Sequence, residues 1–171
     1  MRYYCVLIAD RGRARFFTMD ATESGDASGG PDLVEQADLT NPEKRLPQTD
    51  LFAENKPGAG RETPEGPVHG YDDHRDGYEA ETDRKFAREV VERTAKLVSE
   101  RKCSTVIIAS PSQMLGLLRE YEEVLARSNV NIEVLPKNIT KLSPKEIHQH
   151  LAKENLIPPR RKPSFQAVKN A

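Results

Sequence analysis

The chain has 171 residues, with 26 Lys and Arg against 27 Asp and Glu and a formal net charge of −1. That length fits one domain with tails, and near-neutrality argues against the strong positive field of a dedicated duplex-DNA-binding protein. The two cysteines lie in separate apolar runs, which favours buried free thiols over a zinc site or a secreted disulfide scaffold. No apolar run approaches the roughly 20 residues of a membrane span, so we expect a cytoplasmic protein without membrane insertion.

The beginning of the chain predicts an antiparallel hairpin followed by a third strand. Tyr3–Ala9 is apolar on both faces, as expected of a central strand, and Asp10 and Gly12 in "DRGR" suit a tight turn. Ala14–Met19 predicts the returning strand, and the weak alternation of Leu33–Leu39 predicts a third strand.

Residues 40–78 have no convincing hydrophobic periodicity. They include five prolines and five glycines, which interrupt both helices and strands. Such a long segment without its own secondary structure is usually functional or disordered. We therefore predict a long loop here.

The second half of the chain alternates predicted helices and strands. Glu79–Arg101 carries an apolar stripe at helical spacing, and Ser104–Ser110 and Val130–Leu135 have the β-branched runs of buried strands. Two further helices are announced by capping-box patterns with a proline at the first helical position; the patterns are "SPSQ" from Ser110 and "SPKE" from Ser143.

This order predicts one three-layer α/β domain over residues 1–155. A hairpin start and two helical crossovers give a mixed five-stranded sheet in the order 3-2-1-4-5, with three helices on its faces. The first three strands should be antiparallel and strand 4 parallel to strand 1. Residues 156–171 are rich in proline and basic residues and predict a disordered tail.

Basic residues gather at two places that could bind an anion. Three arginines crowd the hairpin, and "KPGAGR" in the long loop joins cations to glycines that allow close backbone approach to phosphate. If the loop folds back over the hairpin, one RNA- or anion-binding surface forms from Arg11, Arg13, Arg15, Lys56, Gly58, Gly60 and Arg61. The alternative is that Arg13 and Arg15 pair with Glu35 or Asp38 of the neighbouring strand, and the sequence leaves both open.

The remaining histidines and other reactive residues give weaker signals of a functional site. "HGYDDHRD" contains His69 and His74, but its spacing matches no established zinc pattern, so a solvated polar loop is favoured over a metal site. His148 and His150 lie two apart on a predicted helix and are expected at its surface. Sequence position alone assembles no Ser-His-Asp or Cys-His set, so we assign no catalytic residue and expect no cofactor.

Several pieces in a fixed order resemble a known family. They are "VLIADRGRARFF", "NPEKR", "KFAREVVERT", "VIIASPSQMLGLLRE" and "LPKNITKLSPKEIHQHL". Together they resemble the bacterial host-attachment proteins, over roughly residues 2–151. That family in turn is similar to the middle domain of archaeal and eukaryotic peptide-chain release factors and of Pelota. The resemblance implies the release-factor variant of the ribonuclease-H-like fold.

The resemblance also shapes the expected function. Release factors carry a Gly-Gly-Gln tripeptide in the loop before the long helix, whereas this chain has "KPGAGRE" there and its adjacent Gly29 and Gly30 are followed by Pro31. We therefore expect a non-enzymatic module that binds the ribosome or structured RNA and is linked to attachment to host cells. The alternatives are a hydrolase or nuclease that uses the long loop and Asp10, or a protein-interaction module; the oligomeric state is not predicted.

Overall fold

The computed structural model describes residues 2–21, 29–45 and 70–163, without the side chains of residues 45 and 70–74. Its elements, in chain order, are β1 Tyr3–Ala9, β2 Arg13–Asp20, β3 Val34–Thr40, α1 Pro42–Arg45, α3 Gly70–Arg101, β4 Thr105–Ala109, α4 Ser112–Arg119, α5 Glu123–Ala126, β5 Asn131–Leu135 and α6 Pro144–Lys153. None of the described helices combines the length and the apolar character needed to cross a bilayer.

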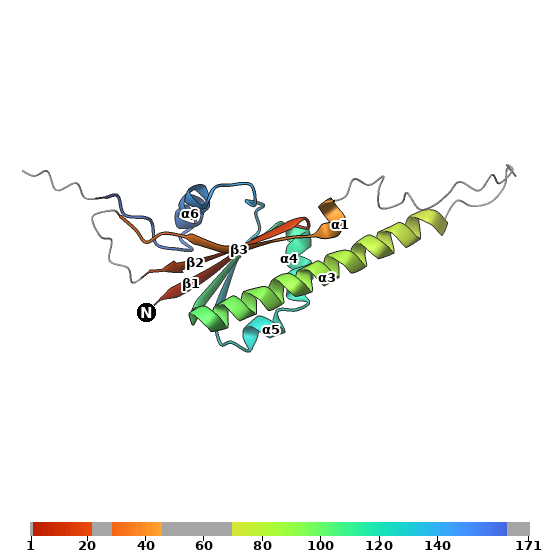
Figure 1. Ribbon diagram of the computed structural model, residues 1–171, viewed down its shortest axis with the longest axis horizontal. Helices are drawn as coiled ribbons and strands as arrows, with labels where there is room; N and C mark the ends of the chain where they lie inside the picture. Colours follow the sequence, from red (N-terminus) through yellow and green to blue (C-terminus); the bar gives the residue numbers. More distant parts are fainter. Residues whose placement is uncertain (1, 22–28, 46–69, 164–171) are drawn as a thin grey trace, which may run out of the picture.

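The five strands form one mixed sheet in the order β3-β2-β1-β4-β5 (Figure 1). β2 is antiparallel to both β1 and β3, whereas β4 is parallel to β1 and β5 is parallel to β4. The predicted strand order and directions are confirmed. β1 lies at the centre, where Val6 pairs with Phe17 of β2 on one side and with Ile107 of β4 on the other. Both faces of β1 are buried in cores, which explains why this strand is apolar on both faces.

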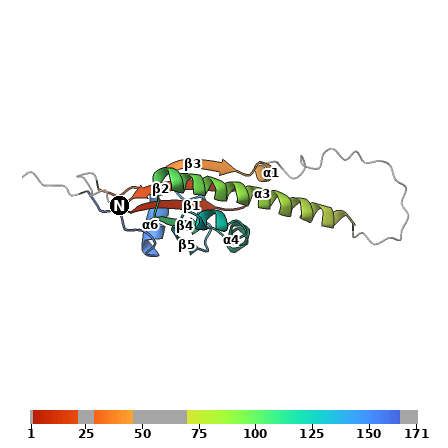
Figure 2. The same cartoon turned by 90° about the horizontal axis from the view of Figure 1, so that it is seen from below.

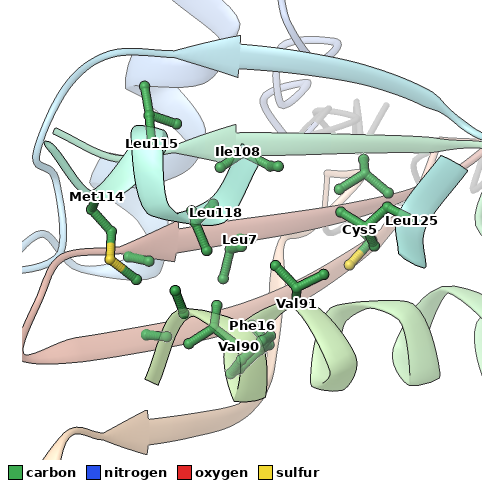
Figure 3. Packing of buried hydrophobic residues seen from close by; sticks show 14 of the residues in the cluster. Cys5, Leu7, Phe16, Val90, Val91, Ile108, Met114, Leu115, Leu118 and Leu125 are labelled. Carbon is green, nitrogen blue, oxygen red and sulfur yellow. The ribbon is translucent and has the colours of Figure 1, made fainter. Parts of the chain in front are cut away.

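Helices cover both faces of the sheet, so the predicted three-layer arrangement is confirmed (Figures 1 and 2). α3, α4 and α5 pack on one face, and Figure 3 shows their apolar side chains meeting Leu7 and Phe16 of the sheet. α6 covers the other face through Ile147 and Leu151. Both cysteines are buried free thiols, as predicted.

The long helix begins nine residues earlier than the sequence predicts, at Gly70 instead of Glu79. An apolar periodicity indicates packing against a core, and residues 75–81, the part of this segment whose side chains are described, contain no buried residue; Thr82 is the first one after them. At about 1.5 Å per residue, the twelve residues up to Glu81 extend roughly 18 Å. Figures 1 and 2 show this part of α3 running past the end of the sheet.

The predicted loop over residues 40–78 is therefore corrected. α1 and the beginning of α3 are helical parts of it, and residues 46–69 lie outside the described residues. The described chain contains five helices instead of three, because α1 is additional and the segment after β4 is divided into α4 and α5.

The two capping patterns have different outcomes. Ser143 caps α6 as predicted: its hydroxyl accepts from the Glu146 N–H at 3.3 Å, and its own N–H donates to Glu146 Oε2 at 2.8 Å. Ser110 does not cap α4, since Pro111 occupies the cap position with an extended backbone and no side-chain cap bond. Ser110 lies one residue too early and is fully buried at the end of β4.

Packing continues past the predicted domain boundary at residue 155. Ile157 is buried in the core beneath α6, the Arg161 N–H donates to the Gly30 carbonyl at 2.9 Å, and the His148 ring bonds the Pro158 carbonyl at 2.9 Å. A carbonyl can only accept, so His148 Nε2 carries the proton. His148 is thus buried, against the prediction of a surface position. Residues 164–171 lie outside the described residues.

Candidate functional site

The turn between β1 and β2 is held by one carboxylate. Asp10 Oδ1 accepts hydrogen bonds from the N–H groups of Gly12 and Arg13, both at 2.8 Å. Asp10 Oδ2 lies 2.8 Å from the Thr140 hydroxyl, which comes from the segment between β5 and α6. An Asp side chain bonded to the backbone two residues on is a typical turn-forming arrangement. Both oxygens of Asp10 therefore support the geometry of this turn.

Arg11, at the tip of the turn, reaches across to the long helix. Its Nε donates to Asp83 Oδ2 at 2.6 Å, and the two side chains are 39% and 4% exposed. Asp83 lies where the apolar stripe of α3 begins, so its carboxylate is taken out of water as the helix packs. A buried carboxylate is costly unless a cation and donors meet it. Arg11 supplies that cation.

Further charges surround this pair at the base of the projecting part of α3. Lys44 Nζ of α1 lies 3.8 Å from Asp83 Oδ1 and 3.7 Å from Glu79 Oε2. Asp83 Oδ1 accepts no hydrogen bond from the described residues. The Glu43 carboxylate bonds the Tyr78 hydroxyl and raises the pKa of that phenol. These contacts tie the turn, α1 and α3 together, and we call Arg11, Lys44, Glu79 and Asp83 the brace.

Arg13 and Arg15 share one face of β2, as predicted, and each meets a different acid of β3. Arg13 donates to Asp38 Oδ2 from Nε at 3.0 Å and from Nη2 at 2.8 Å, with both side chains close to half exposed. An exposed pair of this kind contributes about 0.2–1 kcal/mol to stability. Arg13 is thus free to exchange its partner at little cost in folding.

Arg15 is the buried member of the three. Its Nε and Nη2 donate to the two oxygens of Glu35, both at 2.8 Å, and its Nη1 donates to the carbonyls of Thr140 and Leu142 at 3.1 and 2.6 Å. The guanidinium also lies over the Phe17 ring. The bond to Arg15 lowers the pKa of Glu35, and the same bond raises the pKa of Arg15. Arg15 therefore joins β2, β3 and the segment after β5.

The structure describes only part of the predicted anion-binding surface. The three arginine side chains are present, but each is bound to carboxylates, and they belong to three separate ion pairs. Lys56, Gly58, Gly60 and Arg61 lie outside the described residues. The pairing of Arg13 and Arg15 with Asp38 and Glu35 is the alternative that the sequence left open, and anion binding by this surface stays a prediction.

The weak metal candidates cannot be placed as ligands. His69 lies outside the described residues, and His74 belongs to the first turns of α3, where side chains are not described. Among the side chains that the structure describes, which exclude those of residues 70–74, no cluster of three or more from His, Cys, Asp or Glu could hold a metal ion.

Sequence reasoning missed the partners that make the brace. Asp83 stands three and four positions before Phe86 and Ala87, both buried, so it lies on the apolar stripe of α3. An acid on an apolar stripe is a signal of a buried partner. The sequence contains that signal, but it does not say which of the many cations would meet it.

The chain is similar to one protein family and to two solved structures. A model of the family described as "Protein required for attachment to host cells" matches residues 5–151. No curated protein matches the chain. Two solved structures from Aquifex aeolicus are similar, each with a TM-score of 0.36: the type II variant of the Ppx/GppA phosphatase, at 11% identity over 79% of this chain, and a PPX-GPPA enzyme, at 12% identity over 78%. This chain covers 36% of each of those chains.

The family model therefore spans most of the sequence, from the central strand β1 to Leu151 of α6, and includes the turn, the brace and most of both cores. The chain belongs to the family of proteins required for attachment to host cells.

Proposed function

We propose that this host-attachment-family protein is a non-enzymatic binding module that acts in the cytoplasm on the ribosome or another structured RNA. The proposal includes a fold of the ribonuclease-H-like, release-factor middle-domain type. The observation that carries it is the shape of α3, whose first twelve residues run past the sheet. Those residues lead directly from the segment that contains "KPGAGR".

The first twelve residues of α3, Gly70–Glu81, which we call the arm, extend beyond the sheet and can reach a ligand that the flat sheet cannot. Structured RNA is recognised mainly through its shape, its phosphates and the 2′-hydroxyls of its wide, shallow minor groove, or through single-stranded loops, and the arm can lie against such surfaces. The brace supports such a role, because Arg11 and Lys44 fix the base of the arm against the turn and α1. A rigid base would present the basic, glycine-containing loop in a defined direction at small entropic cost.

The three arginines take different parts in this proposal. Arg15 belongs to the scaffold, because its donors are used by Glu35 and two carbonyls. Arg11 and Arg13 are 39% and 45% exposed and have five N–H donors each, so both can contact a phosphate while they keep a carboxylate partner. With Lys56, Arg61 and the loop glycines Gly58 and Gly60 they form the proposed RNA-contacting end.

Co-sedimentation with ribosomal particles at several salt concentrations tests this function. The double change Lys56→Ala with Arg61→Ala should release the protein at lower salt than the parent, because charge contacts to RNA depend on counterion release. The matched control is Lys96→Ala with Lys102→Ala, which removes two exposed cations near the other end of α3. Failure of the parent to sediment at low salt, or equal release of both double variants, would contradict the proposal.

A further inference from the structure

A second candidate binding site lies on the opposite face of the sheet, beside α6. It is a groove of about 800 Å³ between α6 and residues Pro159–Pro163, which we call the C-terminal strap. The brace and the arm lie toward the opposite end of the molecule, as Figure 1 shows. The groove therefore shares no residue with the surface proposed above. Its volume lies within the range of small-molecule and segment-binding sites.

The strap is held in place by specific contacts. Its backbone pairs with the segment before β3, where the Arg161 N–H donates to the Gly30 carbonyl at 2.9 Å. Arg160 forms an ion pair with Asp32. Just before the strap, Ile157 is buried and Pro158 is bonded to His148 beneath the groove. The groove is thus a feature of the folded domain.

The charge of the groove differs sharply from that of the chain. Five lining residues are basic, namely Lys145, Lys153, Arg160, Arg161 and Lys162, and one is acidic, Asp32, which pairs with Arg160. No ion pair between described residues involves the other four cations. In a chain with a net charge of −1, this is a local excess of about four positive charges on one concave surface. Such a surface attracts an anion that carries several charges.

The dimensions and lining suit a phosphodiester backbone. Lys145 to Lys153 spans about 12 Å along α6 at 1.5 Å per residue, which is long enough to follow a short run of consecutive phosphates on one strand. The four available cations can each contact a phosphate of such a run. Phe, Tyr and Trp are absent from the described residues that line the groove, so stacking of bases is not available there.

We infer that this groove binds the phosphate backbone of a single RNA strand without regard to base sequence. The inference rests on the proposed function for the choice of RNA, and it adds a second contact area on the other side of the molecule. The aliphatic part of the floor, with Leu33, Ala152 and Pro159, would lie against ribose. Two separated contact areas on one ligand raise overall affinity, because the second contact forms within an existing complex.

The test is fluorescence anisotropy of the full chain with a labelled 12-nucleotide single-stranded RNA of mixed sequence, titrated at several salt concentrations. The double change Lys145→Gln with Lys153→Gln should weaken binding on the order of tenfold at 0.1 M salt and make the salt slope shallower by about 1.4, that is about 0.7 for each lost contact. Glutamine is polar and uncharged and has a helix propensity similar to that of lysine, so α6 should fold normally, which circular dichroism will check.

Control variants separate this inference from the proposed function. Lys85→Gln with Lys96→Gln removes two exposed cations of α3 and should leave the oligonucleotide affinity within twofold of the parent. Lys56→Ala with Arg61→Ala tests the loop that precedes the arm, and it should impair ribosome sedimentation while the oligonucleotide still binds the groove. A DNA strand of the same sequence should bind similarly, because the contacts are to phosphate.

Two results would overturn the inference. One is parental affinity and salt slope in the Lys145→Gln, Lys153→Gln variant. The other is stronger binding of a poly-glutamate peptide of equal charge than of the RNA, which would assign the groove to acidic protein segments. Loss of ribosome sedimentation in the Lys56→Ala, Arg61→Ala variant together with unchanged oligonucleotide binding would support the groove independently of the loop and the arm.

Discussion

Replacement of Arg15 by methionine is the most informative perturbation of the hairpin. Methionine keeps much of the aliphatic contact with Phe17 but removes the donors to Glu35 and to the carbonyls of Thr140 and Leu142. Hydrogen bonds to a charged group contribute roughly 1.5–3 kcal/mol each, and removing one partner of a buried pair costs about 3–5 kcal/mol. Glu35 is 30% exposed and can regain water, so we expect a loss of about 3 kcal/mol.

Urea unfolding and thermal melting measure this loss. For a domain of this size, about 3 kcal/mol corresponds to a decrease in Tm of roughly 6–12 °C. The matched control is Arg13→Met, two residues away on the same strand face, whose exposed pair with Asp38 should cost less than about 1 kcal/mol. Equal and small losses in the two variants would refute the assignment of Arg15 to the scaffold. A large loss in both would instead show that Arg13 is structural and not available to a ligand.

Three further predictions test individual elements. Ser143→Ala should lower the free energy of unfolding by about 1 kcal/mol, because the α6 capping box is lost. Ser110→Ala removes no capping hydrogen bond and should not lose this contribution, as thermal melts of both variants will show. Ile157→Ala should cost about 2–4 kcal/mol in urea unfolding, because that side chain is 4% exposed in the second core; an unchanged midpoint would contradict packing past residue 155. The bond to Arg15 holds the pKa of Glu35 below its ordinary value of 4.5. The contribution of Glu35 to the free energy of unfolding is therefore complete above that value and decreases as the pH falls through the lowered pKa. Glu35→Gln should flatten this decrease in a pH series of unfolding curves.

The sequence alone determined the sheet and most of its connections. An apolar run, the tight turn "DRGR" and a second apolar run require a hairpin, and strands alternating with helices require parallel crossovers. These are local patterns, because each depends on residues that lie close together along the chain. The Ser143 capping box belongs to the same class, since all of its bonds lie within three residues. The predicted start of α3 at Glu79 was wrong. The first turns of this helix run past the sheet, so their sequence needs no apolar stripe, and the stripe was the signal on which the prediction depended.

Only the tertiary structure decided which charges meet. Asp83 is 72 residues from Arg11, and the Thr140 and Leu142 carbonyls are 125 and 127 residues from Arg15. Register and topology set these contacts, and 26 basic and 27 acidic residues offer far too many possible pairs for sequence to choose among. The basic groove has the same origin. Its cations come from α6 and from a segment that composition alone reads as a tail, and their charges add only because the chain returns across the domain and pairs with Gly30. Coulombic attraction acts through space, so folding determines which of the chain's charges become a site.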